Sequence, residues 1–346
     1  MDSKRLIHAV AGSGKTRTIV EFLNPEKRNL IITYTENNQN VLKNRIIQKF
    51  GSIPENTYVY GVFEFLYSFC LVPYLGKRPK GINFDYIPKN GKYSESISSD
   101  GRVIHYQLSH ILLSKEMTYN YKKNPIEVDY LVRIEKFFDY VYIDECQDFE
   151  SYDFDWMLSL SKLNINVTLL GDFYQKTYST SNAGNKGKAI HSDFNKWTAA
   201  IRNIGFKIDN QMLSFSYRCP SIICDFVSEK LKISISSKSV NSTASIELIE
   251  DREKIYKIME DDSIIKLFYC KSLNYACYGQ NWGASKGEEY KNVCIILNKR
   301  TYELFKKDQL DRLATTTKAK FYVACTRAMD NLYFISEDKV KYLKKV

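Results

Sequence analysis

The stretch IHAVAGSGKT, Ile7–Thr16, decides the fold of the first part of this chain. An apolar run leads into a loop where Gly12 and Gly14 let backbone N–H groups turn toward an anion, and Lys15 then opens a helix. We predict that Lys15 contacts the β- and γ-phosphates of ATP and that the Thr16 hydroxyl ligates Mg²⁺. A plain glycine turn before a basic helix is the alternative, unless an acidic group for the metal lies downstream.

A second motif supplies that acidic group. FFDYVYIDECQDF, Phe137–Phe149, is an apolar run that ends in Asp144 and Glu145. Open α/β sheets bind their ligands at the carboxyl ends of the strands. Asp144 therefore suits Mg²⁺, and Glu145 suits a base that polarises the attacking water. A solvated acidic turn is the alternative, and it explains the motif less well behind a phosphate loop.

Composition limits the possible partners. The formal net charge is +10, which favours an acidic polymer, and the 26 Tyr and 19 Phe suit base stacking better than a membrane surface. There is no signal peptide and no apolar run long enough to span a bilayer, so we expect a cytoplasmic protein without membrane contact. The eight dispersed cysteines, with Cys270 and Cys294 in apolar strands, are expected to be reduced core thiols.

Apolar runs alternate with helical patterns along the chain. Residues 1–205 are expected to form an α/β domain with a parallel sheet and a basic insertion at about 71–125. Residues 206–346 are expected to form a second α/β domain without a phosphate loop. Strands are predicted at 5–10, 29–35, 139–144, 166–171, 245–249, 264–269, 292–297 and 331–336, and helices at 37–49 and 126–138.

Two such domains suggest a cleft that closes on ATP. Closure depends on the nucleotide if the second domain supplies arginines to the γ-phosphate. The candidates are Arg218 in SFSYRCP and Arg327 in FYVACTRAMD. Each arginine, taken singly, is more often a surface residue.

Seven segments in order resemble the motifs of UvrD/Rep/PcrA-type superfamily 1 DNA helicases, in a compact form. Compact UvrD-like proteins accompany nucleases in anti-phage systems such as Gabija, a context that the resemblance permits without showing it. The seven segments are AVAGSGKT, TYTENNQNVLKNRI, DECQDF, LLGDFYQKTY, SFSYRCP, GASKGEEYKNVCII and FYVACTRA. They span Ala9 to Ala328, nearly the whole chain. The resemblance implies two RecA-like parallel-sheet domains with the ATP site in the cleft between them.

The resemblance also implies roles for further residues. Gln175 matches the glutamine that senses the γ-phosphate, Tyr217 the aromatic that stacks on adenine, and Arg218 and Arg327 the two arginine fingers. The implied nucleotide-binding residues are Ala11, Gly12, Ser13, Gly14, Lys15, Thr16, Tyr217, Gly287 and Glu289. Tyr34 and Tyr178 match aromatic positions that stack on the bases of a single strand, with core packing as the alternative.

Two functions remain open at this stage. The first is an ATP-dependent motor that binds single-stranded DNA, translocates 3′ to 5′ by resemblance, and can separate duplex. The second is a nucleic-acid-sensing ATPase that regulates a protein partner such as a nuclease, because the segment between Arg218 and Lys286 is short where these helicases carry a duplex-gripping insertion. A metabolic phosphate-loop kinase is the third and weakest interpretation, since it leaves five motifs unexplained.

Overall fold

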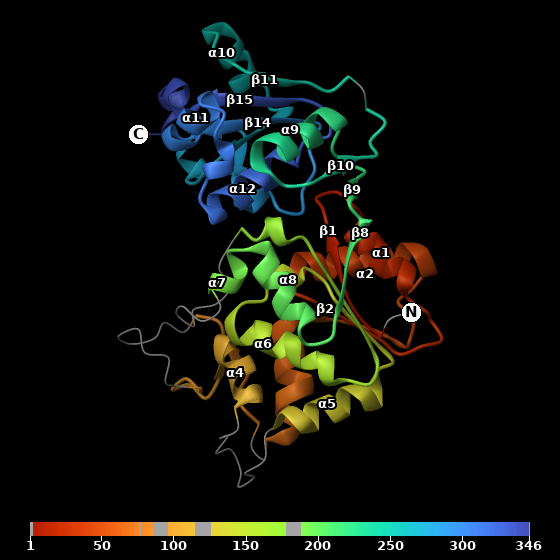
Figure 1. Cartoon of the computed structure of the whole chain (residues 1–346). Helices are drawn as coiled ribbons and strands as arrows, with labels where there is room; N and C mark the ends of the chain where they lie inside the picture. The colour runs from red at the N-terminus through yellow and green to blue at the C-terminus, as the bar shows by residue number, and fades with distance from the viewer. Residues whose placement is uncertain are drawn as a thin grey trace. The chain divides into compact units, whose positions relative to one another are not determined.

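The computed structural model describes residues 3–75, 78–85, 96–114, 126–177, 188–241 and 243–345. The chain forms two compact units, and Figure 1 colours most of the first from red to green and most of the second from green to blue. Unit 1 contains Met1–Ile7, Lys15–Gly171 and Ser179–Asp209, and unit 2 contains His8–Gly14, Asp172–Tyr178 and Asn210–Val346. Unit 2 thus includes two short segments that lie at or directly after the ends of strands of the first sheet. The division into domains 1–205 and 206–346 stays a prediction.

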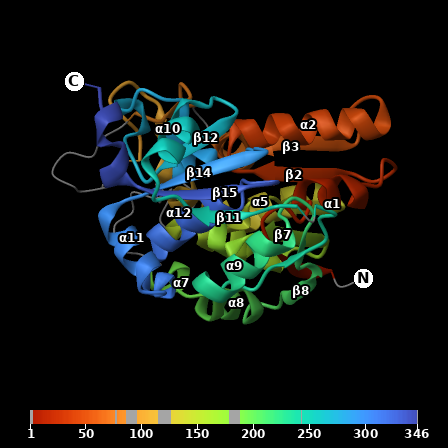
Figure 2. The ribbon, with the colours of Figure 1, turned by 90° about the horizontal axis from the view of Figure 1, so that it is seen from above.

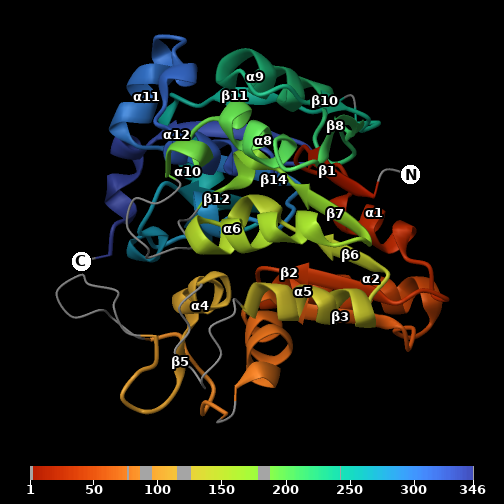
Figure 3. The same ribbon diagram turned by 60° about the horizontal axis from the view of Figure 1, so that its bottom comes forward.

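The first sheet has six strands in the order β3-β2-β6-β7-β1-β8. Figure 3 shows β1, β7, β6, β2 and β3 in succession. The strands are β1 Lys4–Ala9, β2 Asn29–Thr33, β3 Thr57–Gly61, β6 Tyr140–Ile143, β7 Asn166–Gly171 and β8 Lys207–Leu213. β2 pairs in parallel with both β3 and β6, and β6 pairs in parallel with β7. The four strands predicted for this part of the chain are confirmed.

Local signals explain where the longest helix of unit 1 begins and ends. The Oγ1 of Thr35 accepts a hydrogen bond from the N–H of Asn38 at 3.2 Å, which caps the start of α2, Glu36–Phe50. Gly51 ends the helix with φ 81°, and its N–H donates to the carbonyl of Ile47 at 2.8 Å. The other longer helices of this unit are α1 Lys15–Phe22, α5 Ile126–Phe137, α6 Ser151–Ser159 and α8 Phe194–Arg202. The predicted helices at 37–49 and 126–138 are confirmed.

Short elements make up the remainder of unit 1 and the described part of its predicted basic insertion. They are α3 Val62–Glu64, a π-helix Phe65–Leu71, β4 Ile82–Asn83, β5 Val103–Ile104, α4 Leu108–Leu113 and α7 Lys188–His191. β4 and β5 pair in parallel, and α4 packs on α6. Residues 76–77, 86–95 and 115–125 of the insertion lie outside the described residues.

Unit 2 has its own sheet of five parallel strands in the order β11-β15-β14-β12-β13. Figure 2 shows β12, β14, β15 and β11 in succession. The strands are β11 Ile246–Leu248, β12 Ile264–Phe268, β13 Gly279–Asn281, β14 Asn292–Leu297 and β15 Leu332–Ser336, and a separate ribbon pairs β9 Phe215–Ser216 with β10 Ser236–Ser237. The helices are α9 Ser221–Leu231, α10 Arg252–Glu260, α11 Lys299–Lys306 and α12 Thr315–Cys325.

The core of unit 2 contains large aromatic side chains and buried cysteines. Trp282, Phe321 and Phe334 are fully buried and pack in one cluster with the apolar faces of α9 and α12. All eight cysteines are free thiols, and Cys294 is buried in β14 as predicted. The prediction for Cys270 is wrong, because β12 ends at Phe268 and leaves this thiol exposed.

Both sheets are largely parallel and alternate with helices, so the predicted α/β class with two RecA-like sheets is confirmed. Within the described ranges, no helix combines the length and apolar character needed to cross a bilayer.

Candidate active site

The loop between β1 and α1 has the backbone shape of a phosphate cradle. Gly12 and Gly14 have φ values of 70° and 86°, which residues with a side chain rarely adopt. The N–H of Ser13 donates to the carbonyl of Val10 at 3.2 Å and closes the turn. α1 begins directly afterwards at Lys15, so its first N–H groups and the positive end of its dipole face the loop.

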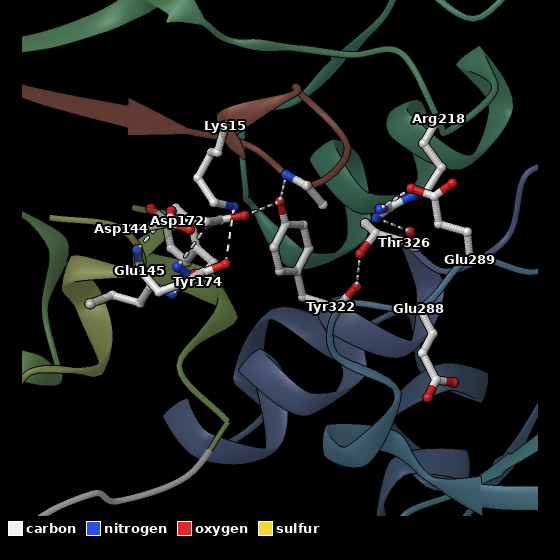
Figure 4. A network of polar contacts seen from close by, with 12 residues as sticks. Lys15, Asp144, Glu145, Asp172, Tyr174, Arg218, Glu288, Glu289, Tyr322 and Thr326 are labelled. Carbon is white, nitrogen blue, oxygen red and sulfur yellow. Dashed lines mark hydrogen bonds and ion pairs between the residues drawn. The ribbon is translucent and has the colours of Figure 1, made fainter. Parts of the chain in front are cut away.

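The acidic motif of unit 1 lies beside Lys15. The Nζ of Lys15 is 3.8 Å from the Oε1 of Glu145, and the two side chains are 11% and 12% exposed (Figure 4). Asp144 follows β6, is 2% exposed, and donates its own N–H to the carbonyl of Ile32 on the neighbouring strand at 2.8 Å. The structure therefore brings together Lys15, Asp144 and Glu145, as the sequence predicts.

Glu145 is held in an unusual backbone conformation. Its φ is 53°, in the left-handed region that a residue with a side chain adopts only at an energetic cost, and such strain clusters at functional sites. The Nε2 of Gln147 donates to the Oε2 of Glu145, so Gln147 orients this carboxylate. The sequence analysis missed this role of Gln147, although the residue lies in the quoted DECQDF motif.

Gln175 lies in a buried turn that follows β7. The turn is a 3₁₀ helix, Phe173–Gln175, and Gln175 is 4% exposed. The Oδ1 of Asp172 caps it by accepting from the N–H of Tyr174 at 3.1 Å. Asp172 is fully buried and also accepts from the hydroxyl of Tyr322 on α12 at 3.0 Å. Neither Asp172 nor Tyr322 was predicted as a site residue.

Arg218 lies in unit 2 between Glu289 and the end of α12. Its Nη2 is 2.5 Å from the Oε1 of Glu289, and its Nη1 donates to the carbonyl of Thr326 at 3.4 Å (Figure 4). Its side chain is 13% exposed and that of Glu289 is 51% exposed. The Nε of Arg218 is buried without a hydrogen-bond partner among the described residues.

Arg327 is 1% exposed and is bonded mainly to main-chain carbonyls. Its Nε donates to the carbonyl of Val323 at 3.0 Å and its Nη1 to the carbonyl of Glu288 at 3.0 Å. Burial, with a smaller effect from the nearby Arg218, lowers the pKa of this guanidinium to about 10. It still carries its charge at neutral pH. Gly287, with φ 93°, allows the turn whose carbonyl Arg327 contacts.

Tyr217 presents an open aromatic face. It is 62% exposed, while its N–H donates to the carbonyl of Gly12 at 2.9 Å. The Nζ of Lys238 lies 4.4 Å from the ring centroid of Phe215 and 5.8 Å from that of Tyr217. The ring is thus available to a flat ligand while its backbone is tied to the phosphate loop.

Tyr34 is half-buried in unit 1. Its ring meets those of Phe63 and Phe149 edge to face, at centroid distances of 5.6 Å and 5.4 Å. Its hydroxyl donates to the Oδ2 of Asp153 at 3.2 Å, and Ser109 donates to the Oδ1 at 2.6 Å. Tyr178, the other predicted stacking residue, lies outside the described residues.

Comparison with known proteins gives the family. Residues 5–60 and 107–336 match the viral superfamily 1 RNA helicase core domain. The chain belongs to this family. The finer resemblance to the UvrD/Rep/PcrA type stays a prediction, because the matching family is that of viral helicases. No curated protein matches the sequence.

Three solved helicase structures are similar to this chain at low sequence identity. The crystal structure of the arterivirus nonstructural protein 10 helicase has a TM-score of 0.50 at 14% identity, and the match covers 99% of this chain and 62% of that one. The same helicase in complex with DNA has a TM-score of 0.49 at 14% identity, covering 99% and 63%. The PRRSV helicase has a TM-score of 0.48 at 14% identity, covering 98% and 53%. The chain thus spans between half and two thirds of the length of these helicases.

The loop geometry yields a prediction for Gly12. A Cβ at this position would lie 2.6 Å from the Oγ of Ser216 and 2.7 Å from the Cβ of Arg218, in addition to the positive φ. We expect Gly12→Ala to lower the free energy of unfolding by roughly 1–3 kcal/mol, measured by chemical denaturation. Gly61→Ala is the control, since its Cβ would meet nothing within 4 Å. Equal stabilities of the two variants would contradict the close packing of the loop.

The contacts of Asp153 predict a pH effect. Burial raises the pKa of this carboxyl to about 6, although hydrogen bonds from Ser109 and Tyr34 oppose the shift. The folded protein then binds more protons at this site than the unfolded chain, so its stability falls as pH rises from about 4 to about 6. We expect Asp153→Asn to remove this decrease in thermal unfolding measurements at pH 4.5–7.5.

A carboxyl whose pKa is shifted in the opposite direction provides the control for Asp153→Asn. The ion pair with Arg28 lowers the pKa of Asp139 to about 2, so the stability that this group contributes is lost only as pH falls below about 4. Asp139→Asn should therefore shift the stability curve by a constant amount across pH 4.5–7.5. An Asp153→Asn curve that runs parallel to the wild-type curve would contradict the assignment.

Proposed function

We propose that this chain is an ATP-driven motor that binds single-stranded nucleic acid, moves along it 3′ to 5′, and separates duplex ahead of it. The observation that supports this most is the meeting of Lys15 with Glu145, beside the buried Asp144, at the carboxyl ends of the strands of one sheet. Membership of a superfamily 1 helicase family supports nucleotide hydrolysis by this site.

The loop is suited to a nucleotide. The Oγ of Ser13 is buried and has no hydrogen-bond partner in the part of the chain that the structure describes. A buried hydroxyl without a partner is costly, and a phosphate oxygen would satisfy it. The loop of Ala11, Gly12, Ser13 and Gly14 would then surround the phosphates, and Lys15 would neutralise their charge.

Mg²⁺ also fits the residues present. This ion is usually held by one or two protein oxygens together with substrate phosphates, and the carboxylate of Asp144 with the hydroxyl of Thr16 provides such a pair. The ion would supply positive charge to the phosphate oxygens. Glu145 would take the proton of the water that attacks the γ-phosphorus, while the bond to the β–γ bridging oxygen breaks and releases ADP and phosphate.

The two arginines and Gln175 would sense the γ-phosphate. Arg218 has a buried Nε without a partner among the described residues, and its ion-pair partner Glu289 is half-exposed, so water can take the place of the guanidinium at that carboxylate. A phosphate can therefore compete for this guanidinium. Arg327 would have to exchange bonds to main-chain carbonyls, so its engagement requires a change in the turn at Gly287.

The exposed ring of Tyr217 is proposed to stack on the base of the nucleotide, and the ring of Tyr34 on a base of the strand. Base stacking and backbone charge depend little on sequence, so strand binding should be sequence-tolerant and weaken with salt. The affinities for DNA and RNA oligonucleotides of the same sequence would show which type of nucleic acid the motor binds.

A second candidate is a strand-sensing ATPase that switches on a protein partner such as a nuclease. The observation behind it is that residues between Arg218 and Lys286 form α9, β10–β13 and α10, so most of them serve the core and sheet of unit 2. Strand displacement on a 3′-tailed duplex by the purified chain would favour the motor. Strand-stimulated hydrolysis without displacement would favour the sensor.

The hydrolytic roles predict different losses from two substitutions. Lys15→Ala should abolish ATP binding, whereas Glu145→Gln should keep ATP binding and lower turnover about 10²–10⁴-fold, the usual contribution of a general base. Equilibrium binding of labelled ATP and phosphate release with a single strand present would measure both. Glu21→Gln, which alters an exposed carboxylate paired with Arg17 on α1, is the control and should behave as wild type. Wild-type turnover in Glu145→Gln would exclude this residue as the base.

Strand binding predicts a separate pattern for Tyr34. Tyr34→Ala should weaken single-strand binding by about 1–3 kcal/mol in anisotropy titrations, while Tyr34→Phe, which keeps the ring, should bind normally. Tyr58→Ala is a matched control, because Tyr58 is 43% exposed on β3 and also meets a phenylalanine edge to face. The contrary outcome is that Tyr34→Ala lowers the free energy of unfolding by roughly 3–5 kcal/mol and leaves the affinity for the single strand unchanged. That result would place the ring in the core and exclude it from strand binding.

A further inference from the structure

A chain of buried hydrogen bonds joins the phosphate loop to α12 within unit 2 (Figure 4). The N–H of Ala11 donates to the hydroxyl oxygen of Tyr322 at 2.9 Å. The same hydroxyl donates to the Oδ2 of Asp172 at 3.0 Å. Ala11, Tyr322 and Asp172 are all fully buried, so water does not compete for these bonds.

The chemical nature of the groups determines which one donates in each of these hydrogen bonds. A backbone N–H can only donate, so the Tyr322 oxygen accepts from Ala11 and must direct its own proton to Asp172. Burial, reinforced by the negative charge of Asp172, raises the pKa of the Tyr322 phenol well above its usual range. The phenol therefore stays protonated and keeps this single orientation.

Asp172 serves the turn that carries Gln175 at the same time. Its Oδ1 accepts from the N–H of Tyr174, and its carbonyl accepts from the N–H of Gln175 at 2.9 Å. One carboxylate thus orders both the turn of Gln175 and the hydroxyl that holds the loop.

Tyr322 also lies one helical turn before the arginine segment. The N–H and the Oγ1 of Thr326 both donate to the carbonyl of Tyr322, at 3.0 Å and 2.8 Å. The carbonyl of Thr326 in turn accepts from Arg218. A continuous series of hydrogen bonds therefore connects the amide of Ala11, through Tyr322, to Thr326, which Arg218 contacts.

We propose that Tyr322, oriented by Asp172, is a positioning residue that holds the phosphate loop in register with Gln175 and Arg218. The inference rests on the proposed ATP hydrolysis and adds to it a residue that touches neither the phosphates nor the attacking water. Loss of the hydroxyl leaves the Ala11 amide without its partner, so the loop shifts relative to the groups that act on the γ-phosphate.

The test compares Tyr322 with a second buried tyrosine whose hydroxyl also donates to a carboxylate but which, among the described residues, does not contact the phosphate loop. Tyr275 is 3% exposed in unit 2, and its hydroxyl donates to a carboxylate, the Oε1 of Glu337, at 2.6 Å. Tyr322→Phe and Tyr275→Phe each remove one buried hydroxyl and keep the ring. The melting temperature of each variant is measured first. ATP turnover and the Michaelis constant for ATP are then measured with a single strand present, at a temperature well below the lower of the two melting temperatures.

We expect a selective loss in Tyr322→Phe. Its kcat should fall about 10²-fold, the scale of a displacement of about 1 Å at a reacting group, whereas Tyr275→Phe should keep the wild-type kcat. The Michaelis constant should change far less, because Lys15 and the other loop amides still hold the phosphates. A kcat for Tyr322→Phe equal to that of Tyr275→Phe would overturn the inference.

Asp172→Asn provides a second route if Tyr322→Phe does not fold. An amide at this position can accept only through its oxygen, so one of the bonds from Tyr174 and Tyr322 is lost, and Glu337→Gln is the corresponding control. Asp172→Asn should lower kcat selectively, and the double variant with Tyr322→Phe should lose no more than the worse single variant. Losses that multiply would overturn the coupling. A wild type that does not hydrolyse ATP would remove the proposed function, and this inference with it.

Discussion

The backbone of the loop at residues 10–14 is the constraint on which the site depends. Gly12 has a positive φ and lies so close to Ser216 and Arg218 that there is no room for a side chain. The loop therefore has one arrangement against β9, and the N–H of Tyr217 bonds to the carbonyl of Gly12. Close packing at one glycine thus sets the place of the residue proposed to stack on the base and of one arginine.

Buried charges give the site its rigidity. A charge removed from water is costly unless hydrogen bonds compensate for it, so a buried charged side chain keeps the one geometry in which its partners are met. Arg327 meets the carbonyls of Val323 and Glu288, and Asp172 meets Tyr174 and Tyr322. A surface pair such as Arg17 with Glu21 imposes no such restriction, because water can replace either partner.

The elements of the fold were predictable where local signals were strong. The apolar run NVCIIL became β14 over its full length, and Thr35 and Gly51 set the ends of α2. Local pattern failed at Cys270, which reads as part of an apolar strand although β12 ends two residues earlier. That strand ends at Phe268, which pairs with Asn281, the last residue of the neighbouring strand β13, and a single segment does not contain this information.

The sequence by itself determined which segments are candidates for the phosphate loop, the acidic pair and the arginine motifs, because each is a short run whose chemistry depends on adjacent residues. Only the tertiary structure identified Tyr322, Asp172 and Asp153. Ala11 and Tyr322 are 311 residues apart, Asp172 and Tyr322 are 150 apart, and Tyr34 and Asp153 are 119 apart. A tyrosine in an apolar helix and an aspartate after a strand carry no local mark of their partners. Their roles arise only when folding buries both groups and leaves each as the other's available hydrogen-bond partner.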